Sequence, residues 1–198
     1  MISSALAGFA ASLAFIVAIG AQNTFVLSQG LRREHVLAIV VTCAASDALL
    51  IAAGIAGLGA FVTDRPAALI AMRWGGAAFL LCYAAFAMRR ALRPGTLAPT
   101  DKRPAGLDTT LLACLAFTYL NPHVYLDTVL LLGAAANQYP HRWLFGTGAA
   151  LASATWFTAL GAGAHRLAPV LARPAAWRAL DGIVAVLMIA IAVSLVRV

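Results

Sequence analysis

The sequence predicts an all-α integral membrane protein with six transmembrane helices in an inverted three-plus-three repeat, in which helices 1 and 4 are broken near mid-membrane. Three observations lead to this prediction. Hydrophobic residues make up 63% of the 198 residues and charged residues only 11%, whereas about 25% of a soluble domain is charged. Six apolar runs alternate with polar gaps. The first and fourth runs each contain a helix-weakening residue beside side-chain amides.

The six apolar runs have about the length that a bilayer-crossing helix needs, roughly 20 residues. They cover residues 4–28, 36–62, 67–88, 109–136, 143–164 and 180–196. The longest gap, about 89–108, is rich in arginine and proline. We expect it to be a linker within a single membrane transporter domain, 1–198, joining half-repeats of about 1–92 and 107–198. Three helices per half make the second half enter the membrane from the opposite side, as an inverted repeat requires.

The positive charges indicate the orientation of the chain. Of the 14 Lys and Arg residues, ten lie in the first, third and fifth gaps and four lie on the opposite side. Positive residues favour the cytoplasmic side, so both termini are predicted to lie outside. Five spans with a cytoplasmic N-terminus stay open as an alternative, because the last run is short. The net charge of +7 is interpreted as topology and contact with membrane lipid, with no nucleic acid as partner.

Two matched breaks are the first candidate site. In the first run Gly20 precedes Gln22 and Asn23, and in the fourth run Asn121 precedes Pro122. Proline removes a backbone donor and crowds the carbonyl of the preceding turn, so the fourth helix is predicted to break there. Unwound backbone at mid-membrane exposes N–H and C=O groups, which can hold the carboxylate and ammonium of an amino acid. Two unrelated packing kinks are the alternative.

Ionisable side chains inside the apolar runs are the second candidate site. A carboxylate at membrane depth costs ~2.5–3.5 kcal/mol on insertion scales and by default marks a functional site. Asp47 lies in the second run, and His123 and Asp127 are spaced to share one helical face. The alternative is that these groups are neutral packing residues. Asp181, at the start of the last run, is instead predicted to interact with the helix N-terminus.

The three cysteines, Cys43, Cys82 and Cys114, all fall inside apolar runs. Their spacing matches no metal-binding pattern. We expect them to be small core residues without a disulfide role, and we expect no metal and no cofactor.

Two long motifs resemble a known family. The run Ile19-Gly20-Ala21-Gln22-Asn23-Thr24-Phe25-Val26-Leu27, followed by 29–35, is similar to the first signature of the LysE family of bacterial amino-acid exporters. The run Leu120-Asn121-Pro122-His123-Val124-Tyr125-Leu126-Asp127-Thr128 resembles the second signature of its lysine/arginine branch, and Ser46-Asp47 fits an acidic position in its second helix. The resemblance implies a multi-pass protein of the bacterial inner membrane that exports basic amino acids, driven by ion gradients.

Together the residues and the resemblance predict an alternating-access exporter coupled to proton uptake. Asp47 and Asp127 would face the cationic side chain of the substrate, with the larger loss on substitution expected at Asp127, and His123 would tune Asp127 or relay protons. The remaining site residues, expected at the substrate's α-groups, are Gly20, Gln22, Asn23, Asn121 and Pro122. Homo-oligomers are compatible with this prediction. The alternatives are an exporter of another small amino acid or amine, a membrane-embedded enzyme, and a structural subunit of a larger complex.

Overall fold

The structure of the chain is a computed structural model, described here for residues 1–17, 20–58, 66–92, 106–167 and 174–197. These residues form helices joined by short turns, and none of them is in a β-strand. The predicted linker lies mostly at 93–105, outside the described residues. Five of the basic residues used to predict the orientation also lie outside them: Arg65, Arg93, Lys102, Arg103 and Arg173.

Each predicted apolar run coincides with helical structure. The first is divided into α1 (Ile2–Ile16) and α2 (Ala21–Arg32), and the second forms α3 (Val36–Ala53) followed by the π-helical turn η1 (Gly54–Leu58). The third forms α5 (Pro66–Leu92). The fourth is divided into α6 (Leu107–Tyr119), α7 (Pro122–Val124), η2 (Tyr125–Leu131) and α8 (Leu132–Ala136). The last two form α9 (Arg142–Leu167) and α10 (Pro174–Arg197).

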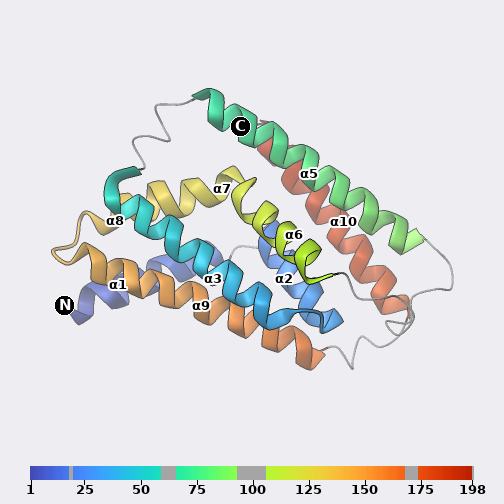
Figure 1. Ribbon diagram of the computed structural model, residues 1–198, viewed down its shortest axis with the longest axis horizontal. Coiled ribbons are helices and arrows are strands. Elements are labelled where there is room, and N and C mark those ends of the chain that lie inside the picture. The colour runs from blue at the N-terminus through green and yellow to red at the C-terminus, as the bar shows by residue number, and fades with distance from the viewer. Residues whose placement is uncertain (18–19, 59–65, 93–105, 168–173, 198) are drawn as a thin grey trace.

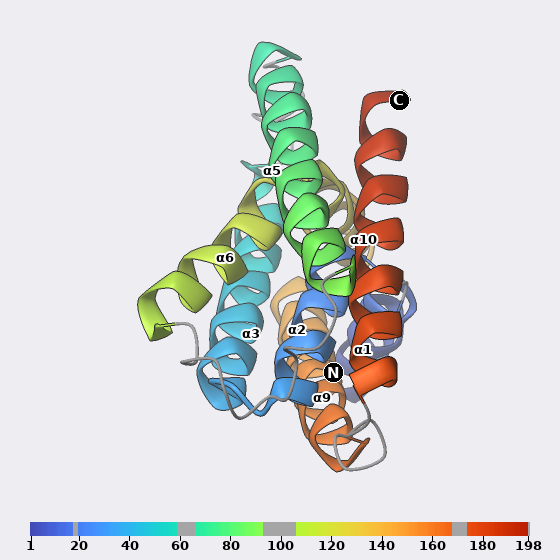
Figure 2. The ribbon, with the colours of Figure 1, turned by 90° about the vertical axis from the view of Figure 1, so that its right-hand side faces the viewer.

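The helices pack in two groups (Figures 1 and 2). Helices α5 and α10 run side by side along one edge of the molecule, and α9 lies against α1, α2 and α3. Between these groups lies a hydrophobic core to which α2, α3, α5, α6, α9 and α10 all contribute buried side chains. The α6 segment diverges from the bundle at one end, as the second view shows (Figure 2).

The broken runs of each half of the sequence pack on a helix of the other half. Both parts of the first run, α1 and α2, pack on α9, while α6 and η2 from the fourth run pack on α3. Each broken element therefore packs on the second long helix of the other half. The end of the fourth run also comes close to the turn after α3: a Cβ at Gly133 in α8 would lie 2.8 Å from the carbonyl carbon of Gly54 in η1. Small residues permit this backbone approach between helices.

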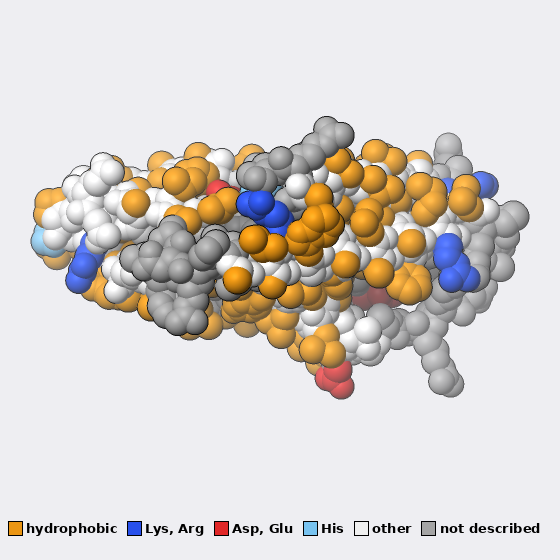
Figure 3. Space-filling model, turned by 90° about the horizontal axis from the view of Figure 1, so that it is seen from above, with side chains coloured by type: hydrophobic (Ala, Val, Ile, Leu, Met, Phe, Trp, Pro, Cys, Tyr) orange, Lys and Arg blue, Asp and Glu red, His pale blue; other side chains and the backbone are white. Residues whose placement is uncertain are grey.

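The surface is apolar to an extent that soluble proteins rarely reach. Figure 3 shows hydrophobic side chains spread along the whole visible face, with few charged ones, and large aliphatic residues such as Leu37 and Leu49 are 79% and 66% exposed. Extended exposed apolar surface marks contact with a partner or a membrane. Among the described residues one helix, Val36–Leu58, is long and apolar enough to cross a bilayer, and α1 with α2 passes the same test as a pair bent by 82°.

Candidate functional site

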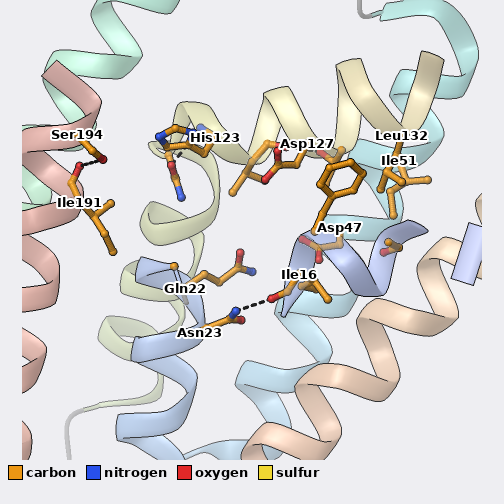
Figure 4. Close-up of a pocket in the computed structure, with 16 residues that line it drawn as sticks. Ile16, Gln22, Asn23, Asp47, Ile51, His123, Asp127, Leu132, Ile191 and Ser194 are labelled. Carbon is orange, nitrogen blue, oxygen red and sulfur yellow. Dashed lines mark hydrogen bonds between the residues drawn. The ribbon is translucent and has the colours of Figure 1, made fainter. Parts of the chain in front are cut away.

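A cavity of about 330 Å³ lies where the two broken elements meet (Figure 4). Pockets for small molecules are typically of this size or somewhat larger. Of the eight residues predicted from sequence, seven line it: Gly20, Gln22, Asn23, Asp47, Asn121, His123 and Asp127. The eighth, Pro122, lies between two of them in the chain. The mouth of the cavity is marked by lining residues that are exposed, namely Phe15, His123 and Ser194.

The first break is held in shape by the side chain of Asn23. Helix α1 ends at Ile16, and α2 begins after Gly20, whose backbone is extended and which has no side-chain cap. The Nδ2 of Asn23 donates a hydrogen bond to the Ile16 carbonyl at 2.6 Å, across the break. Its Oδ1 accepts one from Nε1 of Trp156 in α9 at 3.2 Å. Asn23 therefore satisfies a carbonyl that the break leaves without a helical partner, as apolar surroundings require.

The second break is present where it was predicted, and it takes the form of a new helix start. Helix α6 ends at Tyr119, and α7 begins at Pro122. The backbone N–H of His123 donates to Oδ1 of Asn121 at 3.1 Å, so Asn121 is an N-cap. Proline is favoured at the first helical position because its missing donor would have no helical partner there. The break at this position was predicted correctly, but Pro122 stabilises a helix start rather than distorting a continuous helix.

The two carboxyl groups differ in their surroundings. Asp47 is 4% exposed, and its Oδ2 accepts a hydrogen bond of 2.7 Å from the buried Ser153 hydroxyl in α9. Asp127 is half-buried at the cavity wall. The π-helical turn η2 replaces the regular α-helical spacing assumed for His123 and Asp127, yet both line the cavity from the same segment (Figure 4).

Gln22 brings an unused donor into the cavity. The side chain is 8% exposed, and its Nε2 is buried without a hydrogen-bond partner. The Gln22 side chain lies near the carboxyl of Asp47 and the thiol of Cys43. Its Nε2 forms a hydrogen bond with neither group. Buried polar groups in native proteins nearly always have a partner, so an orphaned donor in a cavity indicates a ligand or water site.

The two broken runs also meet in an aromatic cluster, whose members are not among the described residues that line the cavity. Phe25 of α2, Tyr83 and Phe79 of α5, and Phe117 of α6 contact one another, with ring centroids 4.8 to 6.2 Å apart. Phe25 lies one turn beyond Gln22, and Phe117 lies about one turn before the second break. Both are 1% exposed. These aromatic side chains therefore fill the space between α2, α5 and α6.

Two expectations from sequence were wrong. Asp181 lies in the second turn of α10, which begins at Pro174, and its Oδ1 forms an ion pair with Arg32 of α2 at 3.1 Å. Its partner is therefore on another helix, 149 residues away. Cys82 is exposed, whereas Cys43 and Cys114 are buried as expected, with their sulfur atoms in contact.

Comparison with known proteins decides the family. Residues 13–198 match the model of the LysE type translocator. The chain belongs to the LysE family. LysE-family transporters are membrane proteins, and the exposed apolar surface of this chain agrees with that class.

Named relatives of this LysE-family chain span nearly its full length. The lysine exporter LysE of Corynebacterium diphtheriae is 36% identical over 225 residues, covering 98% of this chain and 99% of the relative. The arginine exporter ArgO of Salmonella paratyphi A is 42% identical over 201 residues, covering 100% and 95%. A Mycobacterium tuberculosis protein whose name describes a candidate amino-acid transporter is 54% identical over 178 residues, covering 89% of each. No solved structure matches this LysE-family chain.

Several residues of the candidate site were not among the site residues predicted from the sequence. Ser153 and Trp156 bind Asp47 and Asn23 from α9, and Ser12, Ile191 and Ser194 line the cavity from α1 and α10. A serine or tryptophan costs little in an apolar helix, so neither its presence nor its spacing distinguishes it from a packing residue. Only the approach of α9 to α2 and α3 assigns these roles.

Proposed function

We propose that this chain exports basic amino acids, lysine or arginine, from the cytoplasm across the bacterial inner membrane. The observation that carries the proposal is the charge of the cavity. Two carboxyl groups, Asp47 and Asp127, line it from the two halves of the sequence, and no Lys or Arg is among its described lining residues. A carboxylate at membrane depth is stable when a cation pairs with it. The relatives named as lysine and arginine exporters support the same substrate class.

The α-groups of the substrate are proposed to bind at the first break. A helix N-terminus presents N–H groups and a positive dipole end, which favour a carboxylate. Helix α2 starts beside the cavity without a side-chain cap, and Gln22 adds its orphaned Nε2 donor at the same level. The corresponding start of α7 is already capped by Asn121. We therefore assign the carboxylate to α2, and we assign positioning roles to Asn23 and Asn121.

Proton exchange provides a route for a cation to leave a negative interior. Moving one positive charge outward works against ~2.3 kcal/mol per 100 mV. Exchange for one inward proton makes the cycle electrically neutral. A carboxyl group in the cavity can hold a proton while the site is empty and release it when a cationic substrate arrives. Asp47 and Asp127 are the proposed carriers of this exchange, and His123 at the cavity mouth is a candidate relay.

Alternating access is the proposed mechanism. We propose that the cavity opens on the side of its exposed lining residues, such as His123, and that the aromatic cluster of Phe25, Phe79, Tyr83 and Phe117 closes it on the opposite side. The reciprocal packing of α1 and α2 on α9, and of α6 and η2 on α3, supports the inverted three-plus-three repeat. With the orientation predicted from the positive charges, the open end faces outward. Opening the aromatic cluster would then expose the same residues to the cytoplasm.

Transport in reconstituted vesicles tests the function. Purified protein would be inserted into vesicles loaded with unlabelled lysine, and counter-flow of labelled lysine, arginine and leucine would be measured with and without a pH gradient. Lysine or arginine should exchange, with a rate that depends on the gradient, and leucine should not. Equal movement of leucine would assign the chain to another small amino acid. No exchange of any of the three would refute the proposal.

A further inference from the structure

Two buried thiols from the two halves of the chain lie in contact. The Sγ atoms of Cys43 in α3 and Cys114 in α6 are 3.2 Å apart, and both residues are 0% exposed. A disulfide has a sulfur–sulfur distance of about 2.05 Å, so the two atoms need to approach by only about 1.2 Å. The residues are 71 positions apart in sequence, so the contact is made by the packing of α6 on α3.

The thiol pair lies in the same buried layer as the aromatic cluster. Cys43 precedes Asp47 by one turn of α3, and Gln22 of the cavity lies near its thiol. Cys114 precedes Phe117 of the aromatic cluster by about one turn of α6, and the buried Thr118 hydroxyl donates to the Cys114 carbonyl at 3.0 Å. Both cysteines belong to the same continuous hydrophobic core as Phe25 and Phe117. Separation of α6 from α3 would therefore accompany any opening of this layer.

We propose that Cys43 and Cys114 form an oxidisable dithiol, and that their disulfide locks α3 to α6 and keeps the cavity closed at that end. The effect on export rests on the proposed function, whereas formation of the bond does not. The oxidant is a small disulfide of the glutathione class. In thiol–disulfide exchange a thiolate attacks one sulfur of the oxidant and forms a mixed disulfide, and the second thiolate then attacks the protein sulfur. The two protons of the cysteines leave with the two small thiols that are released, and the electrons balance.

Burial makes this reaction dependent on motion. Because both thiols are fully enclosed, an oxidant reaches them only when the contact between α3 and α6 opens. Once the bond forms, a layer that must open in each cycle is covalently closed. Export would then stop until a reducing agent restores the two thiols. Oxidation should accordingly be faster while substrate is being exchanged than in its absence.

The full-length protein with Cys82→Ser tests the proposal, because Cys82 is exposed and could link two copies. A protease site inserted between residues 93 and 105 would let the two halves separate on a denaturing gel unless a disulfide joins them. The probe is a membrane-permeant aromatic disulfide, with dithiothreitol as the reductant. Oxidised protein should run as joined halves, its lysine or arginine export should fall at least tenfold, and dithiothreitol should reverse both effects. Variants that also carry Cys43→Ser or Cys114→Ser should show neither.

The two readouts separate the two hypotheses. Halves that separate after oxidation would overturn the proposal, whether or not the protein exports anything. Joined halves with an unchanged export rate would overturn the locking role. Reduced protein that moves neither lysine nor arginine would refute the proposed function, and the gel would still decide whether the bond forms.

Discussion

Replacing Asp47 by Asn removes a charge from the cavity while keeping the shape of the side chain. Asp47 is 4% exposed and hydrogen-bonded to Ser153, so an isosteric change preserves the packing of α3 on α9. The Ser153 hydroxyl can still donate to the amide oxygen of the variant. Any large loss of export must therefore come from the missing negative charge.

The expected magnitude follows from the attraction between a substrate cation and this carboxylate. Two unit charges about 4 Å apart attract by roughly 4 kcal/mol at an effective dielectric of about 20. Removing one member of a buried charged pair typically costs about 2–5 kcal/mol. The cavity is open at one end, so we take the lower part of this range, about 2–3 kcal/mol. At about 1.4 kcal/mol for each factor of ten, half-saturation by lysine or arginine should require roughly 30- to 150-fold more substrate.

Counter-flow in vesicles measures this change directly. Rates would be normalised to inserted protein and recorded over a series of lysine concentrations and pH values. Asp108→Asn is the matched control, because Asp108 is an exposed acid in the first turn of α6 outside the cavity. The control should transport normally, while Asp47→Asn should also flatten the dependence of export on pH. Parental half-saturation together with an unchanged pH dependence would refute the role of Asp47.

Three further predictions concern the same site and its supports. Asp127→Asn should raise the substrate concentration for half-maximal export less than Asp47→Asn does, because Asp127 is only half-buried and solvent screens its charge. A larger rise for Asp127→Asn would contradict this and agree with the order predicted from the sequence motif. Asn121→Ala should lower the free energy of unfolding by about 0.5–2 kcal/mol through loss of the N-cap. Thermal unfolding in detergent measures this loss, with Asn137→Ala at an exposed position as the control. Equal stability of the two variants would contradict the capping role. Gly133→Ala should destabilise the protein by about 1–3 kcal/mol, because the added Cβ would meet the Gly54 backbone. Gly163→Ala should have no such effect, because open space surrounds that position. Equal melting temperatures of the two variants would contradict this packing.

The sequence by itself determined the helical segments and the candidate site. Long apolar runs can be satisfied in a membrane only as helices, so their positions follow from local composition. Gly20 and Pro122 interrupt such runs, and the helices do end beside them. Asp47 and Asp127 could be identified because a carboxyl group in an apolar run is costly wherever its partner lies. Each of these residues can be recognised from its own type and its apolar neighbours in the sequence.

Only the tertiary structure decided which groups meet. The ion pair of Arg32 and Asp181, the contact of Cys43 with Cys114 and the hydrogen bond from Ser153 to Asp47 join residues 71 to 149 positions apart. None of these residues has a spacing that identifies its partner, because the partner is set by the angle and depth at which two helices pack. The same packing brings Trp156 to Asn23 and leaves Gln22 with a free donor in the cavity. Local cost reveals where polar groups are needed, and helix packing determines what they bind.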